Sequence, residues 1–560
     1  MVKDRRIGVG LACLAMLVIF SFYLGMHRIF QVDEVQNAFQ ARLFATGKAA
    51  QYGLGAPFFL LGPLTWLAGA AGSGVDVLVW LRLPFVALMW LNAVLLVKGA
   101  GFRLRSREGL GTLLLAATLA PMWDYGFEIR HDVLLLTGIL TLWCLVREER
   151  LSLAVRFGLL GCLGALLQFI AFKSFIFSLP LLVILGLRAR ARAPRAWLGQ
   201  GLALGCGLAL GLLAGRGATA LAGVWPAFHA DQGVSVRSAL QVQRFSCWST
   251  LLRLLGEAPL LAYAGLAALL APMIPKGGFR LAGFADRPGT PEWIFALAAL
   301  AALLANPTPF AYNLILLVPP FFILVAAHRQ ALLDALAGCT AQTGRLCITF
   351  LLLLHGVPWA VATWRHLAMG NDGQRQVIRV AEAMTDPARD RVFDGSGLVA
   401  TRDPIGYNWL VHGLTLANFA NGVWPTVRAS LAANPTPVVL PSYRLEMLPE
   451  QDKDFIKAHY LALAPDFMVL GGILESGSTR WTCLATGRYQ FDLHASQGAG
   501  PLPLTLDGAA AGTGVHLLGK GEHLFQVPPG DRLVVVWLGP NLPRIPLMAQ
   551  DQRPLFVNWY

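Results

Sequence analysis

The chain has 560 residues, of which 56% are hydrophobic and 14% are charged, and its mean hydropathy is +0.56. This composition excludes an ordinary soluble protein of that length and predicts a polytopic α-helical membrane protein. The formal net charge of +13 is explained by basic loops on one side of a membrane, so we expect no nucleic-acid partner.

Apolar stretches long enough to cross about 30 Å of hydrocarbon recur from Ile7 to about residue 365. They predict about eleven transmembrane helices, at residues 7–26, 76–97, 109–125, 132–146, 154–171, 173–188, 198–222, 251–272, 291–306, 309–327 and 345–365. Arginines and lysines cluster in alternate loops, which places the N-terminus in the cytoplasm. We therefore expect a multi-pass protein of a bacterial inner membrane, with its active site and its C-terminal region in the periplasm.

Two adjacent carboxylates, Asp33 and Glu34, follow the first apolar stretch, where the chain leaves the membrane. Such a pair can deprotonate a hydroxyl, orient it or hold a metal ion. Apolar residues recur every four positions from Val35 to Leu43, which predicts an amphipathic helix in the membrane interface. A second, shorter interfacial helix is expected between residues 53 and 66. The alternative is that the two carboxylates form only an acidic first turn that interacts favourably with the helix dipole.

A second polar cluster lies in the next external loop, within residues 123–132. Its charged members include Glu128, Arg130, His131 and Asp132. Unpaired charges are costly at a membrane boundary, so these side chains are expected to pair with one another or with a ligand. Lys173 lies at the same boundary, between two apolar helices. The alternative for the cluster is a set of surface charges that reach toward the lipid headgroups. The alternative for Lys173 is a hinge residue whose side chain does the same.

These patterns resemble those of the GT-C fold glycosyltransferases, in particular bacterial relatives of protein O-mannosyltransferases and of the aminoarabinose transferase of lipid A. The resemblance covers the whole membrane region and depends on the order and sidedness of the patterns. They are Asp33-Glu34 with Arg42 and Gly47, Arg82-Leu83-Pro84, Arg130 with Asp132, Lys173, and residues 306–313 followed by Pro319-Pro320. Lys173-Ser174 departs from the Lys-Gly pair that relatives often have.

The resemblance implies an inverting transfer of one sugar from a polyprenyl-monophosphate carrier to a hydroxyl of a lipid, glycan or protein acceptor. Asp33 is then the general base, and Glu34 orients the acceptor or the base. Arg130, Lys173 and Arg82 are expected to bind the donor phosphate, since cations are needed where charge develops on a departing phosphoryl oxygen. Supporting roles are expected for Asp132, His131, Glu128 and Tyr312. The tyrosine is alternatively an interfacial anchor.

We expect no cofactor and no metal, because basic side chains are available to bind the phosphate of a monophosphate donor. A metal site is the alternative, since adjacent carboxylates can also bind Mg²⁺ or Mn²⁺. Two other functions stay open. An oligosaccharide transferase or O-antigen ligase would use a pyrophosphate donor. A transporter or flippase for a lipid-linked sugar would also have many helices, but its ionisable residues would gather at the midplane of the membrane rather than at one face.

Beyond residue 368 the sequence becomes soluble in character. We expect a membrane catalytic domain at 1–368, a periplasmic α/β domain at 369–480 and a jelly-roll-like β-sandwich at 481–560. The sandwich is expected either to bind an acceptor glycan or to cap the active site without a ligand of its own. Cys247 and Cys483 are both expected on the external side of the membrane. They could therefore form a disulfide or remain free thiols.

Overall fold

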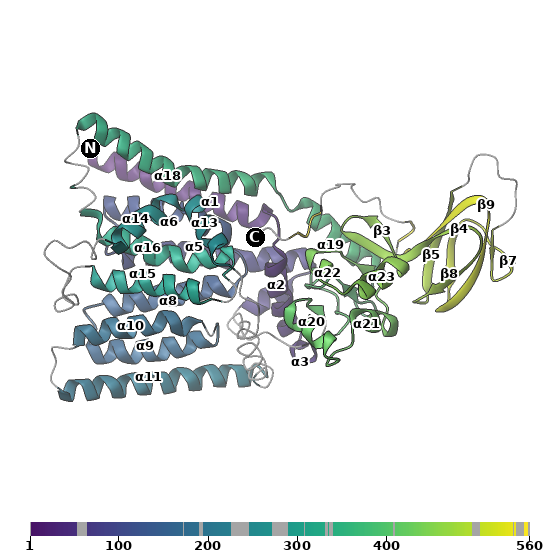
Figure 1. The fold of residues 1–560 in the computed structure, drawn as a ribbon, viewed down its shortest axis with the longest axis horizontal. Coiled ribbons are helices and arrows are strands. Elements are labelled where there is room, and N and C mark those ends of the chain that lie inside the picture. Colours follow the sequence, from purple (N-terminus) through teal and green to yellow (C-terminus); the bar gives the residue numbers. More distant parts are fainter. Residues whose placement is uncertain are drawn as a thin grey trace.

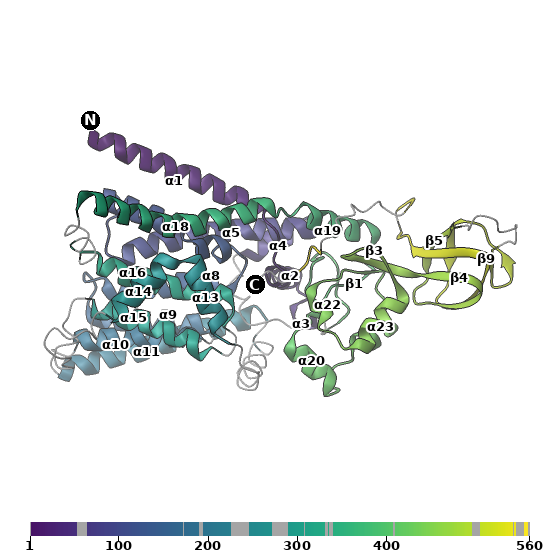
Figure 2. The same ribbon diagram turned by 45° about the horizontal axis from the view of Figure 1, so that its top comes forward.

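The structure, a computed structural model, has a bundle of helices at one end and a β-sheet at the other, with shorter helices between them (Figure 1). It describes residues 2–52, 64–171, 173–189, 194–223, 225, 246–270, 289–306, 309–330, 334, 340–406, 409–494, 504–540, 542–544 and 554–557. The first helix, α1 (Val2–His27), lies along the outside of the bundle (Figure 2). Its large apolar side chains, such as Met16 and Ile19, are exposed, as expected for a helix in contact with lipid.

The bundle contains at least one helix in every interval that was predicted to cross the membrane. Besides α1 these are α5 (Gly74–Gly99), α6 (Arg107–Ala117), α7 (Ala120–Tyr125), α8 (His131–Arg147), α9 (Leu153–Gln168), α10 (Ser174–Ala189), α11 (Pro194–Leu221), α13 (Trp248–Glu257), α14 (Pro259–Leu270), α15 (Thr290–Ala305), α16 (Leu314–Ala327) and α18 (Ala341–Ala368). Among the described residues, α1, α5, α11 and α18 are long and apolar enough to cross a membrane, and the bent pair α13–α14 is a fifth candidate. The predicted number of spans is therefore not confirmed.

Prolines explain two of the interruptions that shorten the predicted spans. The interval 109–125 holds two helices rather than one, with Pro121 in the first turn of α7, where its missing N–H costs no helical hydrogen bond. α13 and α14 are bent by 112° relative to each other, and Pro259 is the first residue of α14.

The described residues that follow α1 form three helices, α2 (Val32–Ala45), α3 (Ala49–Tyr52) and α4 (Thr65–Ala70). The longest of them, α2, is largely buried. The predicted apolar face of α2 is buried, but so are the polar residues Asn37 and Gln40. α2 is therefore not a half-exposed interfacial helix. It is covered by α4, by α5 and by the C-terminal region, where Trp409 contacts Phe39 edge-on. Residues 53–63, most of the second expected interfacial helix, lie outside the described residues.

The C-terminal region is hydrogen-bonded directly to the segment between α1 and α2. Helix α19 (Asp372–Met384) begins shortly after the end of α18. The N–H of Ile29 donates to the carbonyl of Met369 at 3.1 Å, and Phe30 and Gln374 exchange two hydrogen bonds of 2.6 and 2.9 Å. These bonds fix the backbone immediately before Asp33.

The described strands form one nine-stranded sheet in the order β1-β2-β4-β9-β5-β8, with β3 on β4, β6 on β9 and β7 on β6. They are β1 (Val392–Phe393), β2 (Val438–Val439), β3 (Tyr460–Ala464), β4 (Phe467–Cys483), β5 (Gly487–His494), β6 (Thr505–Leu506), β7 (Ala509–Ala510), β8 (Gly514–Leu518) and β9 (Gly521–Trp537). Four helices accompany them: α20 (Gly413–Ala420), α21 (Val427–Ala433), α22 (Tyr443–Glu446) and α23 (Glu450–His459).

The strand pairing differs from the expected sandwich of two sheets. β4 and β9 have 17 residues each and pair antiparallel, with an irregularity between Glu475 and Gly477 that lets the ribbon bend. The first part of β4 pairs with β2 and β3 and the second with β9, so the described strands belong to one curled sheet (Figure 1). The expected boundary at residue 480 falls inside β4, and the division into domains stays a prediction.

Cys247 and Cys483 are both free thiols. Cys483 is buried at the end of β4, where it donates to the carbonyl of Ala485 at 3.2 Å and to the hydroxyl of Tyr489 at 3.3 Å. The aromatic ring of Tyr489 packs edge-on against Trp481 and Trp537. Cys483 is thus part of the core of the sheet, and the structure does not contain the disulfide that the sequence left open.

Candidate active site

Glu34 and Arg82 form a fully buried ion pair. Glu34 lies in the first turn of α2, where the helix dipole favours a carboxylate. Nε and Nη2 of Arg82 donate to its two oxygens, each at 2.6 Å. The guanidinium also donates to the carbonyls of Gly25, Arg28 and Ile29. Because both side chains use their polar atoms in the protein interior, the contacts favour a structural role over the expected roles in acceptor and phosphate binding.

Asp33, the neighbour of Glu34, lies at the edge of the interior, with 23% of its side chain exposed. Its carboxylate accepts from Nη1 of Arg130 at 3.4 Å, from Nη2 of Arg444 at 2.5 Å and from the hydroxyl of Tyr443 at 3.1 Å. Burial raises the pKa of Asp33, but the charges of Arg130 and Arg444 outweigh this effect and hold the pKa below its ordinary value. Asp33 is therefore ionised at neutral pH.

Tyr443 and Arg444 come from α22, more than 400 residues after Asp33 in the chain. Nη1 of Arg444 donates to the carbonyl of Val411 at 3.0 Å, which fixes the guanidinium against the carboxylate. Burial and the charge of Asp33 raise the pKa of Tyr443, so its hydroxyl keeps its proton and donates. Sequence reasoning missed both residues, because no local pattern marks a contact between such distant segments.

Arg130 connects the two clusters that the sequence predicted. It is the N-cap residue of α8, and its side chain is almost fully buried. Besides Asp33, its guanidinium faces the carboxylates of Asp132 at 3.6 Å and Glu128 at 4.0 Å. It also lies 3.6 Å from the centre of the Tyr312 ring, in a cation–π contact. Tyr312 is thus placed beside the charged cluster, as a residue of the expected site and not only as an interfacial anchor.

Lys173 lies beside the same cluster, just before α10. Its Nζ is 2.5 Å from Oδ1 of Asp132 and 3.2 Å from the side-chain oxygen of Asn313. His131 approaches Asp132 at 3.7 Å. With 28% of its side chain exposed, Lys173 is the most accessible of the three expected phosphate-binding cations, ahead of Arg130 and Arg82. The structure therefore brings together every predicted site residue, with Arg82 and Glu34 on the interior side.

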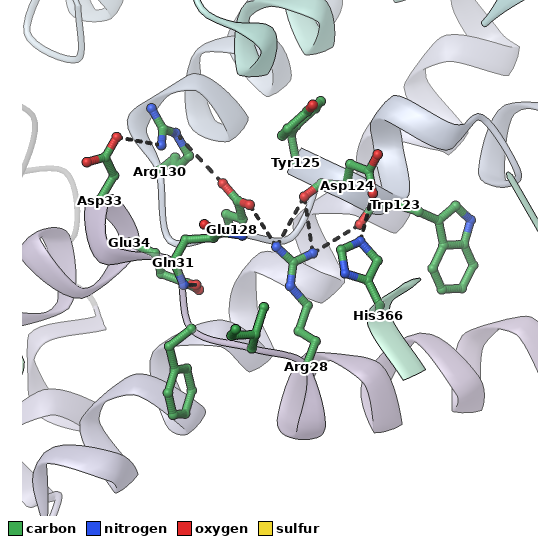
Figure 3. A network of polar contacts seen from close by, with 12 residues as sticks. Arg28, Gln31, Asp33, Glu34, Trp123, Asp124, Tyr125, Glu128, Arg130 and His366 are labelled. Carbon is green, nitrogen blue, oxygen red and sulfur yellow. Dashed lines mark hydrogen bonds and ion pairs between the residues drawn. The ribbon is translucent and has the colours of Figure 1, made fainter. Parts of the chain in front are cut away.

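A buried polar network continues inward from Arg130 (Figure 3). Glu128 pairs with Arg28 at 2.7 Å, and Arg28 donates to the carbonyl of Asp124 at 3.1 Å. The carboxylate of Asp124 then contacts His366 of α18 at 2.7 Å. Arg28 and His366 were also missed from the sequence, since each belongs to a pair of basic residues at the end of an apolar helix, where such residues usually mark the membrane boundary. The network ties α1, α7 and α18 to the loop that holds Arg130.

Within the described residues, no group of three or more His, Cys, Asp or Glu side chains has a geometry that could hold a metal ion. The adjacent carboxylates do not act as a pair, because Glu34 points into the interior toward Arg82 while Asp33 faces Arg130 and Arg444. The donor set expected for Mg²⁺ or Mn²⁺ is therefore divided between two environments.

No model of a known protein family matches the chain. No curated protein matches it either. Among solved structures, ArnT from Cupriavidus metallidurans bound to undecaprenyl phosphate is similar over 83% of this chain and 97% of that chain, with 16% identity and a TM-score of 0.53. The chain has the GT-C fold.

Structures of the oligosaccharyltransferase of Archaeoglobus fulgidus are also similar. The apo form is 13% identical over 81% of this chain and 74% of that chain. AglB in complex with an inhibitory peptide and a dolichol-phosphate is 12% identical over 80% and 72%. The TM-score is 0.44 for each. The similarity to ArnT supports the GT-C fold at the level of architecture, and the chemistry has to be argued from the site.

Proposed function

We propose that the chain is an inverting glycosyltransferase that moves a single sugar from a polyprenyl-monophosphate carrier to an acceptor hydroxyl at the periplasmic face of a bacterial inner membrane. The observation that carries this proposal is the position of Asp33, a partly exposed carboxylate beside a cluster of cations. The binding of undecaprenyl phosphate by ArnT, a protein with the same fold, supports the class of donor.

Asp33 acts as the general base in this scheme. The acceptor oxygen forms a bond to the anomeric carbon while its proton passes to the carboxylate of Asp33. The bond between the anomeric carbon and the phosphate oxygen breaks, and its electron pair leaves with the phosphate. Attack from the side opposite the leaving group inverts the anomeric centre. The products are the glycosylated acceptor and polyprenyl phosphate.

Arg130 and Lys173 stabilise the charge on the leaving phosphate. Arg28, Arg130, Lys173 and Arg444 face Asp33, Glu128 and Asp132, and four cations against three carboxylates leave an excess of one positive charge. Such an excess favours an anionic ligand. In this assignment Asp132 positions Lys173, and Glu34 with Arg82 holds α2. The divided donor set leads us to propose that no metal is required.

The test is the mass of lipid-linked and protein-linked glycans in membranes that contain the intact chain or Asp33→Asn. We expect one sugar unit to disappear from an acceptor while its polyprenyl-phosphate donor accumulates. Asp372→Asn, which changes an exposed carboxylate at the start of α19, is the matched control and should leave the glycans unchanged. Unchanged glycans in Asp33→Asn would contradict the proposal, and a pyrophosphate-linked oligosaccharide that accumulates would point to an oligosaccharide transferase.

A further inference from the structure

A cavity of about 260 Å³ lies in the C-terminal region directly behind Tyr443. It is open to the surface and is lined by residues of α22 and α23, the start of β4 and residues 554–557. Tyr443 is common to this cavity and to the candidate active site, because it lines the cavity while its hydroxyl donates to Asp33. The cavity therefore adjoins the proposed site of transfer.

The walls of the cavity are hydrogen-bonded to the segment that carries Asp33. The N–H of Tyr443 donates to the carbonyl of Phe556 at 3.0 Å, which holds α22 to the C-terminal segment. The side chain of Gln374 donates to the carbonyls of both Leu555 and Phe30, at 2.9 Å each. Gln374 therefore links the C-terminal wall of the cavity to the backbone just before α2.

The lining combines apolar surface with charges of both signs. Tyr443, Phe556 and Met468 contribute aromatic and apolar surface, while the exposed side chains of Lys457 and Glu446 contribute charge. A sugar ring has the matching chemistry, because its C–H faces pack against apolar groups and its hydroxyls bond to charged ones. The volume is just below the range of about 300–1,000 Å³ that is typical of small-molecule sites, which suits a ligand as small as one sugar unit.

We propose that this cavity is a subsite for one saccharide unit of the acceptor, next to the hydroxyl that reacts at Asp33. The inference rests on the proposed function, and it names the acceptor as a glycan or glycolipid rather than a bare protein side chain. Tyr443 connects the two sites: one residue contacts the bound sugar and holds the general base.

The experiment is saturation-transfer NMR of the full chain in lipid nanodiscs, with methyl glycosides of glucose, galactose and mannose and methyl glucuronide as probes. Lys457→Glu reverses a charge at the cavity, and Met468→Trp fills it. Lys520→Glu reverses an exposed lysine elsewhere in the same region and is the matched control. We expect at least one probe to bind the intact chain, and its affinity to fall about tenfold or more in the two cavity variants but not in the control.

Asp33→Asn separates this inference from the proposed function. Binding is measured without donor or turnover, so the probe should still bind when the general base has been removed. Loss of transfer with retained, cavity-dependent binding supports both claims. Failure of every glycoside to bind the intact chain, or equal binding in the cavity variants, would overturn the subsite even if transfer depends on Asp33. Binding of a short Ser/Thr peptide at this cavity in place of the glycosides would overturn it as well.

Discussion

Asp33 and Glu34 are adjacent in sequence, yet they belong to two different regions of the molecule. Glu34 is enclosed with Arg82 in the interior, where it caps the start of α2 at Gln31 and ties this helix to α5 and to the loop before α8. Asp33 lies at the rim, where the membrane region and the C-terminal region meet. The comparison shows that two adjacent carboxylates can lie in different environments: Glu34 is fully buried, whereas Asp33 is partly exposed, as the proposed function requires of a general base.

The largest effect on activity is expected for Asp33→Asn. Loss of a general base lowers kcat by about 100- to 10,000-fold. The melting temperature should fall much less than in a Glu34 variant, because Asp33 is partly exposed and Asn still accepts hydrogen bonds. Turnover of purified protein and thermal unfolding of the same sample check both statements. A variant that retains most of its kcat would remove Asp33 from the mechanism.

The opposite pattern is expected for Glu34→Gln. This change leaves the buried charge of Arg82 without its partner and should cost about 3–5 kcal/mol of stability. Glu108→Gln, in the exposed first turn of α6, is the matched control and should unfold like the intact chain. Thermal unfolding in detergent measures the difference. If Glu34→Gln were as stable as the control but inactive, Glu34 would belong to the catalytic machinery instead.

Arg444→Gln should change the pH dependence of transfer. Arg444 lowers the pKa of Asp33, so its removal raises that pKa. The base is active when ionised, and activity is lost as the pH falls through its pKa. The acidic limb of the kcat profile should therefore move to higher pH in Arg444→Gln and stay in place in Arg480→Gln, an exposed arginine of β4. An unmoved limb would mean that Arg444 does not act on the reacting base.

The smallest effect is expected for Tyr443→Phe, which removes one hydrogen bond to Asp33 and keeps the ring. A hydrogen bond to a charged group contributes about 1.5–3 kcal/mol, so kcat should fall by about 10- to 100-fold at most. Tyr23→Phe, at an exposed position of α1, should have no effect. Steady-state kinetics give the comparison, and a loss as large as that of Asp33→Asn would assign Tyr443 a direct part in the reaction.

Much of the site was predictable because many of its residues are marked by their own neighbours in the sequence. The exit from the first apolar stretch marked Asp33, and the cost of unpaired charge at a membrane boundary correctly predicted that Glu128, Arg130 and Asp132 would pair. The order of the loops also brought Lys173 to the same face. Each of these arguments depends on a residue and its neighbours in the chain.

The rest of the site depends on contacts that no local pattern encodes. Arg444 contacts Asp33 only because folding brings α22 next to the start of α2. Arg82 points into the interior, where it is hydrogen-bonded to Glu34. The same reason explains why the number of spans is not confirmed and why the strands pair differently from the expected sandwich. Hydropathy identifies apolar helices, but it does not decide how many of them cross the membrane. Strand propensity likewise did not indicate that β4 extends from one expected domain into the next.

The most direct measurement of the central claim uses a nucleophile that carries no proton. Azide does not need a general base, so purified Asp33→Ala supplied with the polyprenyl-phosphate donor and azide should release a glycosyl azide of inverted configuration. The same treatment of Arg130→Ala should not restore transfer, because azide does not replace the cation that the leaving phosphate has lost. If Asp33→Ala binds the donor but azide yields no glycosyl product, Asp33 does not serve as the base and the account is contradicted.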